Sequence, residues 1–461
     1  MITHLRARNF KSWEDTGPIR MAPLTALFGA NSSGKTAILQ LLLMLKQTVQ
    51  SADRSLPLQT SGAQAYTDLG TFLDIVHEHK APGELAFEIG WTLPRSLKIR
   101  DPEDPQGKRL QFSVAAMSLG AAVEGDRERI SVERFQYSFE SAGAGVSLGM
   151  RRKTNGSGKN SEKYDLTYSG FEPLKSRGRP PTAFAAPAKS YIFPDQVTAS
   201  YRNLGFLSSL VLEFEQQLQR VYYLGPLREY PHRVYGWAGE QPQDVGQRGE
   251  LAVPALLAAE AKGMKVGHGR GRQLVGLRVA QWLKYLGLIR EFRLQAIGER
   301  RTQYEVRVRQ SPGASEVLIT DVGFGVSQIL PVLTLCYYVP ERSTIIMEQP
   351  EIHLHPAVQA GLADVFIDAI KSRRIQIILE SHSEHLLRRL QRRMAEEKLS
   401  PDDTALYFAK MDNGRSVLER LEVDLFGNIR NWPESFFGDE LGDLVRMTEA
   451  ATKPRRKLTV G

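Results

Sequence analysis

One segment near the N-terminus combines residue types that bind phosphate. It reads Gly29-Ala30-Asn31-Ser32-Ser33-Gly34-Lys35-Thr36. The segment fits the pattern G-x-x-x-x-G-K-[ST] at every fixed position. In this pattern backbone N–H groups surround an anion, the lysine reaches the β- and γ-phosphates, and the hydroxyl lies on Mg²⁺. We therefore predict that the segment binds a nucleoside triphosphate, with Lys35 on the phosphates and Thr36 at the magnesium ion.

A second set of chemical residues lies between positions 320 and 390. A glycine-punctuated turn at 321–328 precedes an apolar helix, and its backbone and Ser327 are suited either to hold a phosphate or simply to cap that helix. The apolar run 343–347 predicts a strand that ends on acidic residues, where enzymes with a phosphate loop place their Mg²⁺-binding carboxylate. Another buried strand, 376–379, runs into Glu380-Ser381-His382-Ser383-Glu384-His385.

The histidines and glutamates of this second set also allow a different interpretation, a metal site. Four histidines lie near glutamates in this set. No His-Glu-x-x-His helix is present, however, and a histidine at a strand end suits a phosphate sensor better than a zinc ligand. We favour the phosphate sensor.

The elements around these residues must bring them together. The apolar run 24–28 predicts a buried strand before the phosphate loop, and 37–45 predicts a helix after it. Residues 2–10 predict an edge strand, whereas 85–91, 110–116 and 130–139 predict an antiparallel region. The Gly-, Ser-, Pro- and base-rich stretch 151–189 predicts an exposed loop or flexible arm. Helices are expected at 203–219, 251–262 and 272–288, and strands at 221–224, 304–309, 406–410 and 417–423.

Composition limits the class of protein. The 461 residues are 42% hydrophobic and 24% charged, typical of a soluble globular protein, and no apolar run is long enough to span a bilayer. The start lacks the apolar core of a secretory signal, and the single cysteine, Cys336, excludes a disulfide framework and a cysteine-based zinc site. We expect a cytoplasmic protein without a membrane partner. The net charge of +8 permits nucleic-acid binding without demonstrating it.

The order of the motifs resembles the ABC-type ATPase heads of the RecF, SMC and OLD group. The resemblance is carried by a strand leading into Asn9-Phe10-Lys11-Ser12, the phosphate loop, a late Gly/Ser signature, a strand ending in Glu-x-Pro-Glu-x-His-Leu-His-Pro, and a closing Ser-His-Ser. It is specific over residues 1–50 and 320–390 and loose over 90–300. More narrowly, the chain resembles small OLD-like bacterial "AAA family" ATPases with a short C-terminal domain of unknown function, whose characteristic segment matches 431–437. Members are often encoded in antiviral defence loci beside a nuclease or toxin.

The resemblance implies roles for the matching positions, with ATP and Mg²⁺ as cofactors. Glu348 takes the Mg²⁺-associated Walker B position, and the implied metal ligands are Thr36 and Glu348. His382 takes the switch-histidine position. The signature, which in this superfamily contacts the γ-phosphate bound to the opposite subunit, implies a homodimer or higher oligomer. The implied phosphate-loop residues are Gly29, Asn31, Ser32, Ser33, Gly34, Lys35 and Thr36, and the implied signature residues are Gly323, Gly325, Ser327 and Gln328.

One position departs from the pattern. ABC-type heads usually have a catalytic glutamate directly after the first Walker B acid, and this chain has Gln349. An amide cannot accept a proton from the attacking water, and general-base help is worth roughly 10²–10⁴-fold in rate. Either Glu351 supplies the base, or hydrolysis is slow and ATP acts mainly as a clamp. The catalytic candidates are Glu348, Gln349, Glu351 and His382.

The expected fold class is α/β. It is an ABC/SMC-head-like P-loop ATPase with a mixed sheet, an antiparallel β lobe and a helical insertion. No heptads indicate a long coiled coil, and the residues after His385 hold no Asp-x-Asp pair for a nuclease. The expected domains are an N-terminal ATPase half (1–90), a β-rich lobe with a basic loop (91–200), the helical insertion (201–300), a C-terminal ATPase half (301–400) and a small C-terminal domain (401–461).

The function expected from this resemblance is an oligomeric, slowly hydrolysing sensor or scaffold ATPase. It would control a separate effector protein, such as a nuclease or toxin, in bacterial antiviral defence. The alternative is a RecF-like DNA clamp in repair or recombination, while a transporter ATPase subunit is disfavoured by the Glu-x-Pro-Glu-x-His-Leu-His-Pro segment. Two basic clusters favour DNA, although solvated surface explains both more simply. They comprise Arg151, Arg152, Lys153, Lys159 and Lys163, and Arg388, Arg389, Arg392 and Arg393.

Overall fold

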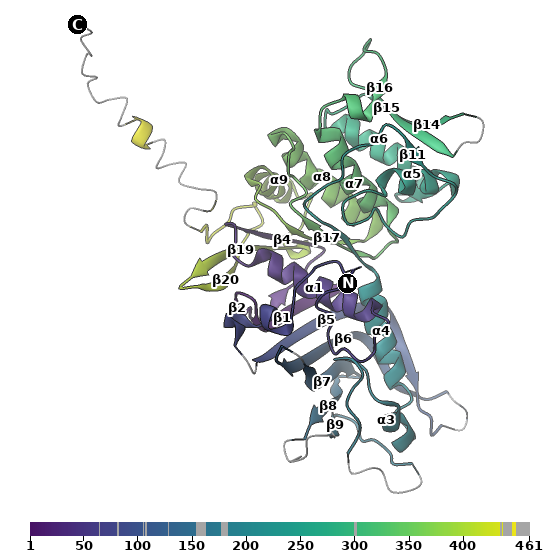
Figure 1. The fold of residues 1–461 in the computed structure, drawn as a ribbon, viewed down its shortest axis with the longest axis vertical. Coiled ribbons are helices and arrows are strands. Elements are labelled where there is room, and N and C mark those ends of the chain that lie inside the picture. Colours follow the sequence, from purple (N-terminus) through teal and green to yellow (C-terminus); the bar gives the residue numbers. More distant parts are fainter. Residues whose placement is uncertain are drawn as a thin grey trace.

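The computed structural model places the candidate residues on a central mixed sheet (Figure 1). It describes residues 1–63, 65–80, 83–104, 106, 108–127, 129–153, 163–176, 183–298, 302–433, 436 and 445–448. The central sheet has six strands in the order β10-β17-β18-β4-β19-β20, and only β20 runs antiparallel to its neighbour. The carboxyl ends of the five parallel strands therefore meet at one edge. The bounds are β10 Val221–Leu224, β17 Thr344–Glu348, β18 Gln376–Glu380, β4 Leu24–Gly29, β19 Thr404–Asp412 and β20 Arg415–Arg420.

Helices cover both faces of this sheet. Helices α1 and α4 share a hydrophobic core with the antiparallel lobe, whereas α5 to α9 build a second core on the other face (Figure 1). The main helices are α1 Lys35–Gln50, α4 Leu207–Gln219, α5 Ala252–Ala261, α6 Val275–Tyr285, α7 Gly325–Tyr338, α8 Pro356–Arg373 and α9 Glu384–Ala395. The short ones are α2 Phe72–Ile75, α3 Asp195–Ser200, η1 His77–His79, η2 Gly269–Gly271, η3 Ile319–Asp321 and η4 Pro401–Asp403.

The central strands are mainly apolar because both of their faces are buried. In β17, Ile346 enters the core with α1, whereas Ile345 and Met347 enter the core beneath α7 and α8. Successive side chains of a strand point to opposite faces, so a strand covered on both sides needs apolar residues at every position. Polar groups are therefore confined to the strand ends.

A separate lobe is an eight-stranded antiparallel sheet, drawn from purple to blue in Figure 1. The expected strands at 85–91, 110–116 and 130–139 are confirmed, and each belongs to a longer strand. The sheet order is β2-β1-β5-β6-β7-β8-β9, with β3 also paired to β1. The bounds are β1 Ile2–Phe10, β2 Trp13–Asp15, β3 Ile19–Arg20, β5 Gly83–Arg100, β6 Leu110–Gly125, β7 Ile130–Ser141, β8 Ala144–Arg152 and β9 Tyr164–Ser169.

Two sequence-based expectations were wrong in this lobe. The strand at 2–10 is not an edge strand, because β2 and β3 fold back onto one side of it while β5 pairs with the other. The stretch 151–189 is not simply a loop, since β8 extends to Arg152 and β9 pairs with it. Tyr164 anchors β9, because its ring is buried and its hydroxyl donates to the Val132 carbonyl oxygen. The basic and glycine-rich composition concealed this short strand.

Smaller strands accompany the helices of the second core. They are β11 Tyr235–Gly236, β14 Glu291–Ile297, β15 Gln303–Arg309 and β16 Val317–Leu318 in one sheet, and β12 Lys265–Val266 and β13 Gln273–Leu274 in another. The fold is thus α/β with an antiparallel lobe, as expected. Within the described residues the longest helix, α8, has 18 residues, so no long coiled coil is present there. None of the described helices is long and apolar enough to cross a membrane.

Candidate nucleotide site

The phosphate loop connects the end of β4 to the start of α1, as the sequence predicts. Its first glycine, Gly29, has φ 137°, and a Cβ there would lie 2.0 Å from the carbonyl oxygen of Ala409 on the neighbouring strand β19. Gly34 has φ 89°, and a Cβ there would lie 2.4 Å from Oγ of Ser416. Both positions therefore require glycine, because the loop turns sharply against β19 and β20.

Lys35 is folded back onto this loop. Its Nζ donates to the carbonyl oxygens of Ala30 (2.6 Å) and Gly29 (3.1 Å), and the side chain is only 2% exposed. Burial lowers the pKa of Lys35, and the nearby Glu380 carboxylate, 3.8 Å from Nζ, opposes that shift. The ammonium is thus held inside the loop by neutral acceptors, which a phosphate can replace with charge-assisted hydrogen bonds.

The carboxylate closest to the loop is one to which the sequence analysis assigned no role. The Thr36 hydroxyl donates to Oε2 of Glu380 at 2.7 Å. Glu380 ends β18, the strand directly beside β4, whereas Glu348 ends β17, one strand further away. The rule that selected Glu348, a carboxylate at the end of a buried strand, applies equally to Glu380. Only the strand order shows which of the two is nearer.

Glu348 lies beside Glu380 across the sheet and is 9% exposed. Its Oε1 accepts a hydrogen bond from the Tyr223 hydroxyl at 2.9 Å. Burial is the main reason that the pKa of Glu348 is raised, and the Glu380 charge adds to the effect. Tyr223, on β10, is therefore a second residue that the sequence analysis missed, and nothing in its local pattern distinguishes it from a core tyrosine.

Glu351 and His382 lie together at the same edge. Oε1 of Glu351 accepts from the Ser381 hydroxyl and from the His382 backbone N–H, both at 2.7 Å. Burial raises the pKa of Glu351 despite these hydrogen bonds. His382 Nε2 lies 3.9 Å from Oε1 of Glu380, and its pKa is lowered first by burial and then by the Lys35 charge. The predicted switch histidine is therefore near the phosphate-loop lysine.

Gln349 bridges the two strand ends through its backbone. Its N–H donates to the Glu380 carbonyl oxygen at 2.9 Å, and its φ is 44°. A non-glycine residue with positive φ costs of order 1–3 kcal/mol and persists only where the surroundings enforce it. The backbone of Gln349 is thus fixed between the ends of β17 and β18.

The signature segment lies elsewhere in the chain, at the start of α7. The Ser327 hydroxyl donates to the Phe324 carbonyl oxygen at 2.7 Å, and Gln328 is 3% exposed. Gly325 is the first residue of α7, and Gly323 lies two residues before it. The structure therefore gathers the predicted loop, Walker B and switch residues, and no hydrogen bond within the described residues joins Ser327 or Gln328 to the loop.

The gathered residues fit magnesium and a triphosphate. Mg²⁺ prefers oxygen ligands, and usually takes one or two carboxylates together with substrate phosphates and waters. The Thr36 hydroxyl and the carboxylates of Glu380 and Glu348 supply such oxygens, and Lys35 supplies the cation for the phosphates. Among the described residues, no group of three or more His, Cys, Asp or Glu side chains forms a dedicated metal site. When bound, Mg²⁺ would neutralise charge on the phosphate oxygens.

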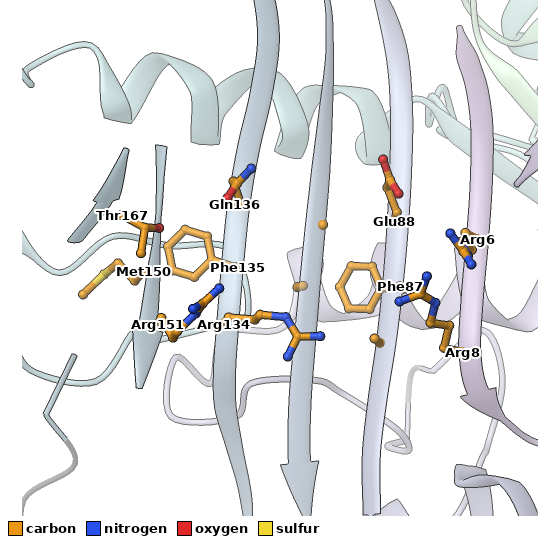
Figure 2. A pocket seen from close by; sticks show the side chains of 13 residues that line it. Arg6, Arg8, Phe87, Glu88, Arg134, Phe135, Gln136, Met150, Arg151 and Thr167 are labelled. Carbon is orange, nitrogen blue, oxygen red and sulfur yellow. The ribbon is translucent and has the colours of Figure 1, made fainter. Parts of the chain in front are cut away.

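A cavity of about 260 Å³ lies on the antiparallel sheet (Figure 2). Four arginines line it, and three of them are ion-paired within the chain. Arg6 and Arg8 contact Asp15 at 2.6 and 3.1 Å, and Arg134 contacts Glu84 at 3.1 Å. Arg151 is the fourth. Much of the positive charge of the arginines labelled in Figure 2 is thus neutralised by the carboxylates of Asp15 and Glu84.

Both basic clusters that favoured DNA also contain internal ion pairs. All four arginines of α9 are paired, and so are two residues of the loop cluster, while Lys159 lies outside the described residues. The pairs are Arg388–Glu384, Arg389–Asp364, Arg392–Glu396, Arg393–Asp364, Arg152–Glu124 and Lys153–Asp165. Their role in the fold weakens them as evidence for a nucleic-acid surface.

Known proteins are similar to parts of this chain. Residues 281–387 match a family described as an AAA ATPase domain, and residues 399–447 match a protein of unknown function (DUF3696). The comparison with curated proteins found no match. Solved structures with similarity include an SMC head bound to the C-winged helix domain of ScpA (13% identity, TM-score 0.44, 92% of this chain and 98% of that chain). The SMC head domain from Thermotoga maritima is another (12% identity, TM-score 0.38, 92% and 99%).

The AAA match includes α7, β17, α8 and β18, and it does not include the phosphate loop at 29–36. The loop is identified by its own motif, and the structure joins the two segments through Thr36 and Glu380. The DUF3696 match agrees with the expected short C-terminal domain of unknown function, part of which lies outside the described residues. The phosphate loop, the strand-end carboxylates and the AAA ATPase match over residues 281–387 together support ATP binding and hydrolysis by this chain.

Proposed function

We propose that this ATPase is a nucleotide-controlled switch, in which ATP closes two copies of the chain upon each other. The observation that carries the proposal is the incomplete site within one chain. Lys35, Thr36, Glu380 and His382 are gathered at one sheet edge, while Ser327 lies at the start of α7 without a hydrogen bond to them. A second copy would supply its own signature turn to complete the site.

The proposed roles follow from the geometry of each side chain. The loop from Gly29 to Thr36 binds the phosphates and Lys35 neutralises them. Mg²⁺ is held by Thr36 with Glu348, and the contact of Glu380 with Thr36 adds that carboxylate to the metal environment. His382 reports whether a phosphate lies beside Lys35.

Slow hydrolysis is the second part of the proposal. Gln349 lies where a catalytic carboxylate is usual, and the buried Glu351 has one oxygen engaged by Ser381 and His382. A long-lived ATP state would hold the closed assembly together and keep a separate effector protein bound. The resemblance to defence-associated ATPases favours a nuclease or toxin as that effector. The internal pairing of both basic clusters makes the DNA clamp the less favoured alternative.

Hybrid assemblies test the sharing of sites. Lys35→Ala chains and Ser327→Arg chains are each expected to be inactive, while their mixture recovers ATPase activity at sites built from one intact half of each. Circular dichroism shows that each variant is folded, and differential tagging shows that hybrids form. An exposed serine on α4, Ser208, provides the control variant Ser208→Arg, which retains activity alone. Hybrids that form and remain inactive at every ratio would contradict the proposal.

A further inference from the structure

Arg228 lies in the turn that leaves the sheet beside the proposed magnesium site. Strand β10 runs parallel to β17, with Leu224 opposite Met347, so the turn emerges at the edge where Glu348 lies. The backbone of the turn is fixed, because Gly225 N–H donates to the Gln247 carbonyl oxygen at 2.8 Å and Glu229 N–H to that of Arg248 at 2.9 Å. The position of Arg228 is therefore set by the sheet.

The guanidinium of Arg228 is buried, and its two Nη groups make no hydrogen bond within the described structure. The residue is 7% exposed. Burial lowers the pKa of Arg228 to about 10, although Tyr223, Glu348 and Glu351 favour its charged form. An unpaired buried charge is costly, so its retention calls for an explanation other than stability.

The neighbouring carboxylates do not use these donors. Oε1 of Glu348 is bonded to Tyr223, and Oε1 of Glu351 is bonded to Ser381 and His382. Oε2 of Glu351 is itself buried without a partner. Within the described residues, the ion pairs closer than 4.0 Å do not include Arg228. The carboxylates balance the charge of Arg228 from a distance and leave its planar fork of N–H groups available to another anion.

We propose that Arg228 binds the terminal phosphate of the nucleoside triphosphate and so distinguishes ATP from ADP. The inference rests on the proposed function of the phosphate loop. Lys35 lies at the end of β4 and Arg228 beyond the end of β10, with β18 and β17 between them. A phosphate held by Lys35 beside Glu380 would face Glu348, which lies opposite Glu380 and is one of the carboxylates that surround Arg228. Arginine suits this task because its fork binds phosphate oxygens in pairs.

The same turn offers a path from the phosphate to the signature. Tyr230 follows Arg228 by two residues, and its ring centre lies 5.4 Å from that of Phe324 at the start of α7. The Phe324 ring also lies 5.7 Å from His353, which follows the Walker B strand. A shift of Arg228 toward a phosphate would therefore move groups that pack against the signature turn.

The test compares the affinities of Arg228→Met for a non-hydrolysable ATP analogue and for ADP, both with Mg²⁺, by calorimetry. Hydrogen bonds to a charged group are worth about 1.5–3 kcal/mol, or roughly 10- to 100-fold in affinity. We expect that loss for the ATP analogue and a change of less than about twofold for ADP. Arg228→Lys, which keeps the charge without the fork, should lose less. Arg220→Met, an exposed arginine at the amino end of β10, is the matched control.

Other outcomes separate a failure of the Arg228 inference from a failure of the phosphate-loop assignment. Equal loss for both nucleotides would make Arg228 a positioning residue for Glu348 and Glu351 and overturn the inference, as would unchanged affinity for both. Thermal unfolding separates these results from misfolding, and Arg228→Lys replaces the methionine variant if that variant unfolds. A wild-type chain that binds neither nucleotide would instead contradict the phosphate-loop assignment itself.

Discussion

The two large sheets of this protein differ in whether their charged side chains are buried or exposed. At the edge of the central sheet, Lys35 and Glu380 are 2% and 5% exposed. Glu380 contacts Lys35 and Thr36, which are distant from it in the sequence. On the antiparallel sheet, Arg134 on β7 and Glu84 on β5 form an exposed pair across the intervening strand β6. A parallel sheet covered on both faces leaves only its strand ends to polar groups, whereas an antiparallel sheet can keep one face in water. Buried charge is therefore informative about function here, and surface charge is not.

The largest expected effect is on nucleotide binding by Lys35→Ala. Removal of the loop's ammonium should lower ATP affinity by at least about 100-fold, because charge-assisted hydrogen bonds to the phosphates are lost. Equilibrium dialysis measures the affinity. Arg134→Ala on the antiparallel sheet should leave it unchanged. Equal affinities in wild type and Lys35→Ala would place the nucleotide elsewhere and remove the contrast between the sheets.

The next effect is on turnover at Gln349. If the amide acts as a brake, Gln349→Glu should raise the hydrolysis rate by up to roughly 10²–10⁴-fold, the value of a positioned general base. Faster hydrolysis should also shorten the lifetime of the ATP-bound assembly, which sedimentation can follow.

Glu351→Gln tests the rival explanation for the same site. A robust wild-type ATPase that this variant abolishes, together with no gain from Gln349→Glu, would show that Glu351 is the base. The brake would then be refuted, while the assignment of the site would stand. The Ser381 and His382 donors to Oε1 can remain in this variant, because glutamine also presents a carbonyl oxygen.

A smaller effect is expected on the pH dependence of stability. Burial raises the pKa of Glu348 above its ordinary value of 4.5, so the folded state keeps this proton after the unfolded state has lost it. The contribution of Glu348 to stability therefore falls as pH rises from about 4.5 through its folded pKa. Glu348→Gln does not titrate, so its melting temperature relative to wild type should rise across this window and then level off. A flat difference between Glu348→Gln and wild type across this window would contradict the prediction.

The smallest effect is expected for the surface pair itself. A double-mutant cycle with Arg134→Ala and Glu84→Ala should give a coupling free energy of about 0.2–1 kcal/mol, because both side chains remain hydrated. The coupling should shrink in 1 M salt. A coupling well above that range would show that the two sheets use charge more similarly than their burial indicates.

The local chemistry of the site was readable from the sequence. The phosphate loop is contiguous, so Gly29, Gly34, Lys35 and Thr36 form a recognisable pattern at fixed spacing. The end of β17 at Glu348 and the end of β18 two residues before His382 could also be predicted, because fully buried strands are mainly apolar and stop where charged residues begin. These features depend on neighbours in the chain.

Only the tertiary structure decided which of these groups meet. Thr36 and Glu380 are 344 residues apart, and they touch because β18 lies between β17 and β4. The pairing of Tyr223 with Glu348 and the burial of Arg228 follow in the same way from the place of β10 beside β17. Strand order arises from packing among distant segments. The residue pattern within one strand therefore does not predict which strands lie beside it. That is why the sequence named the carboxylate at the end of β17, while the fold brought the one at the end of β18 to the loop.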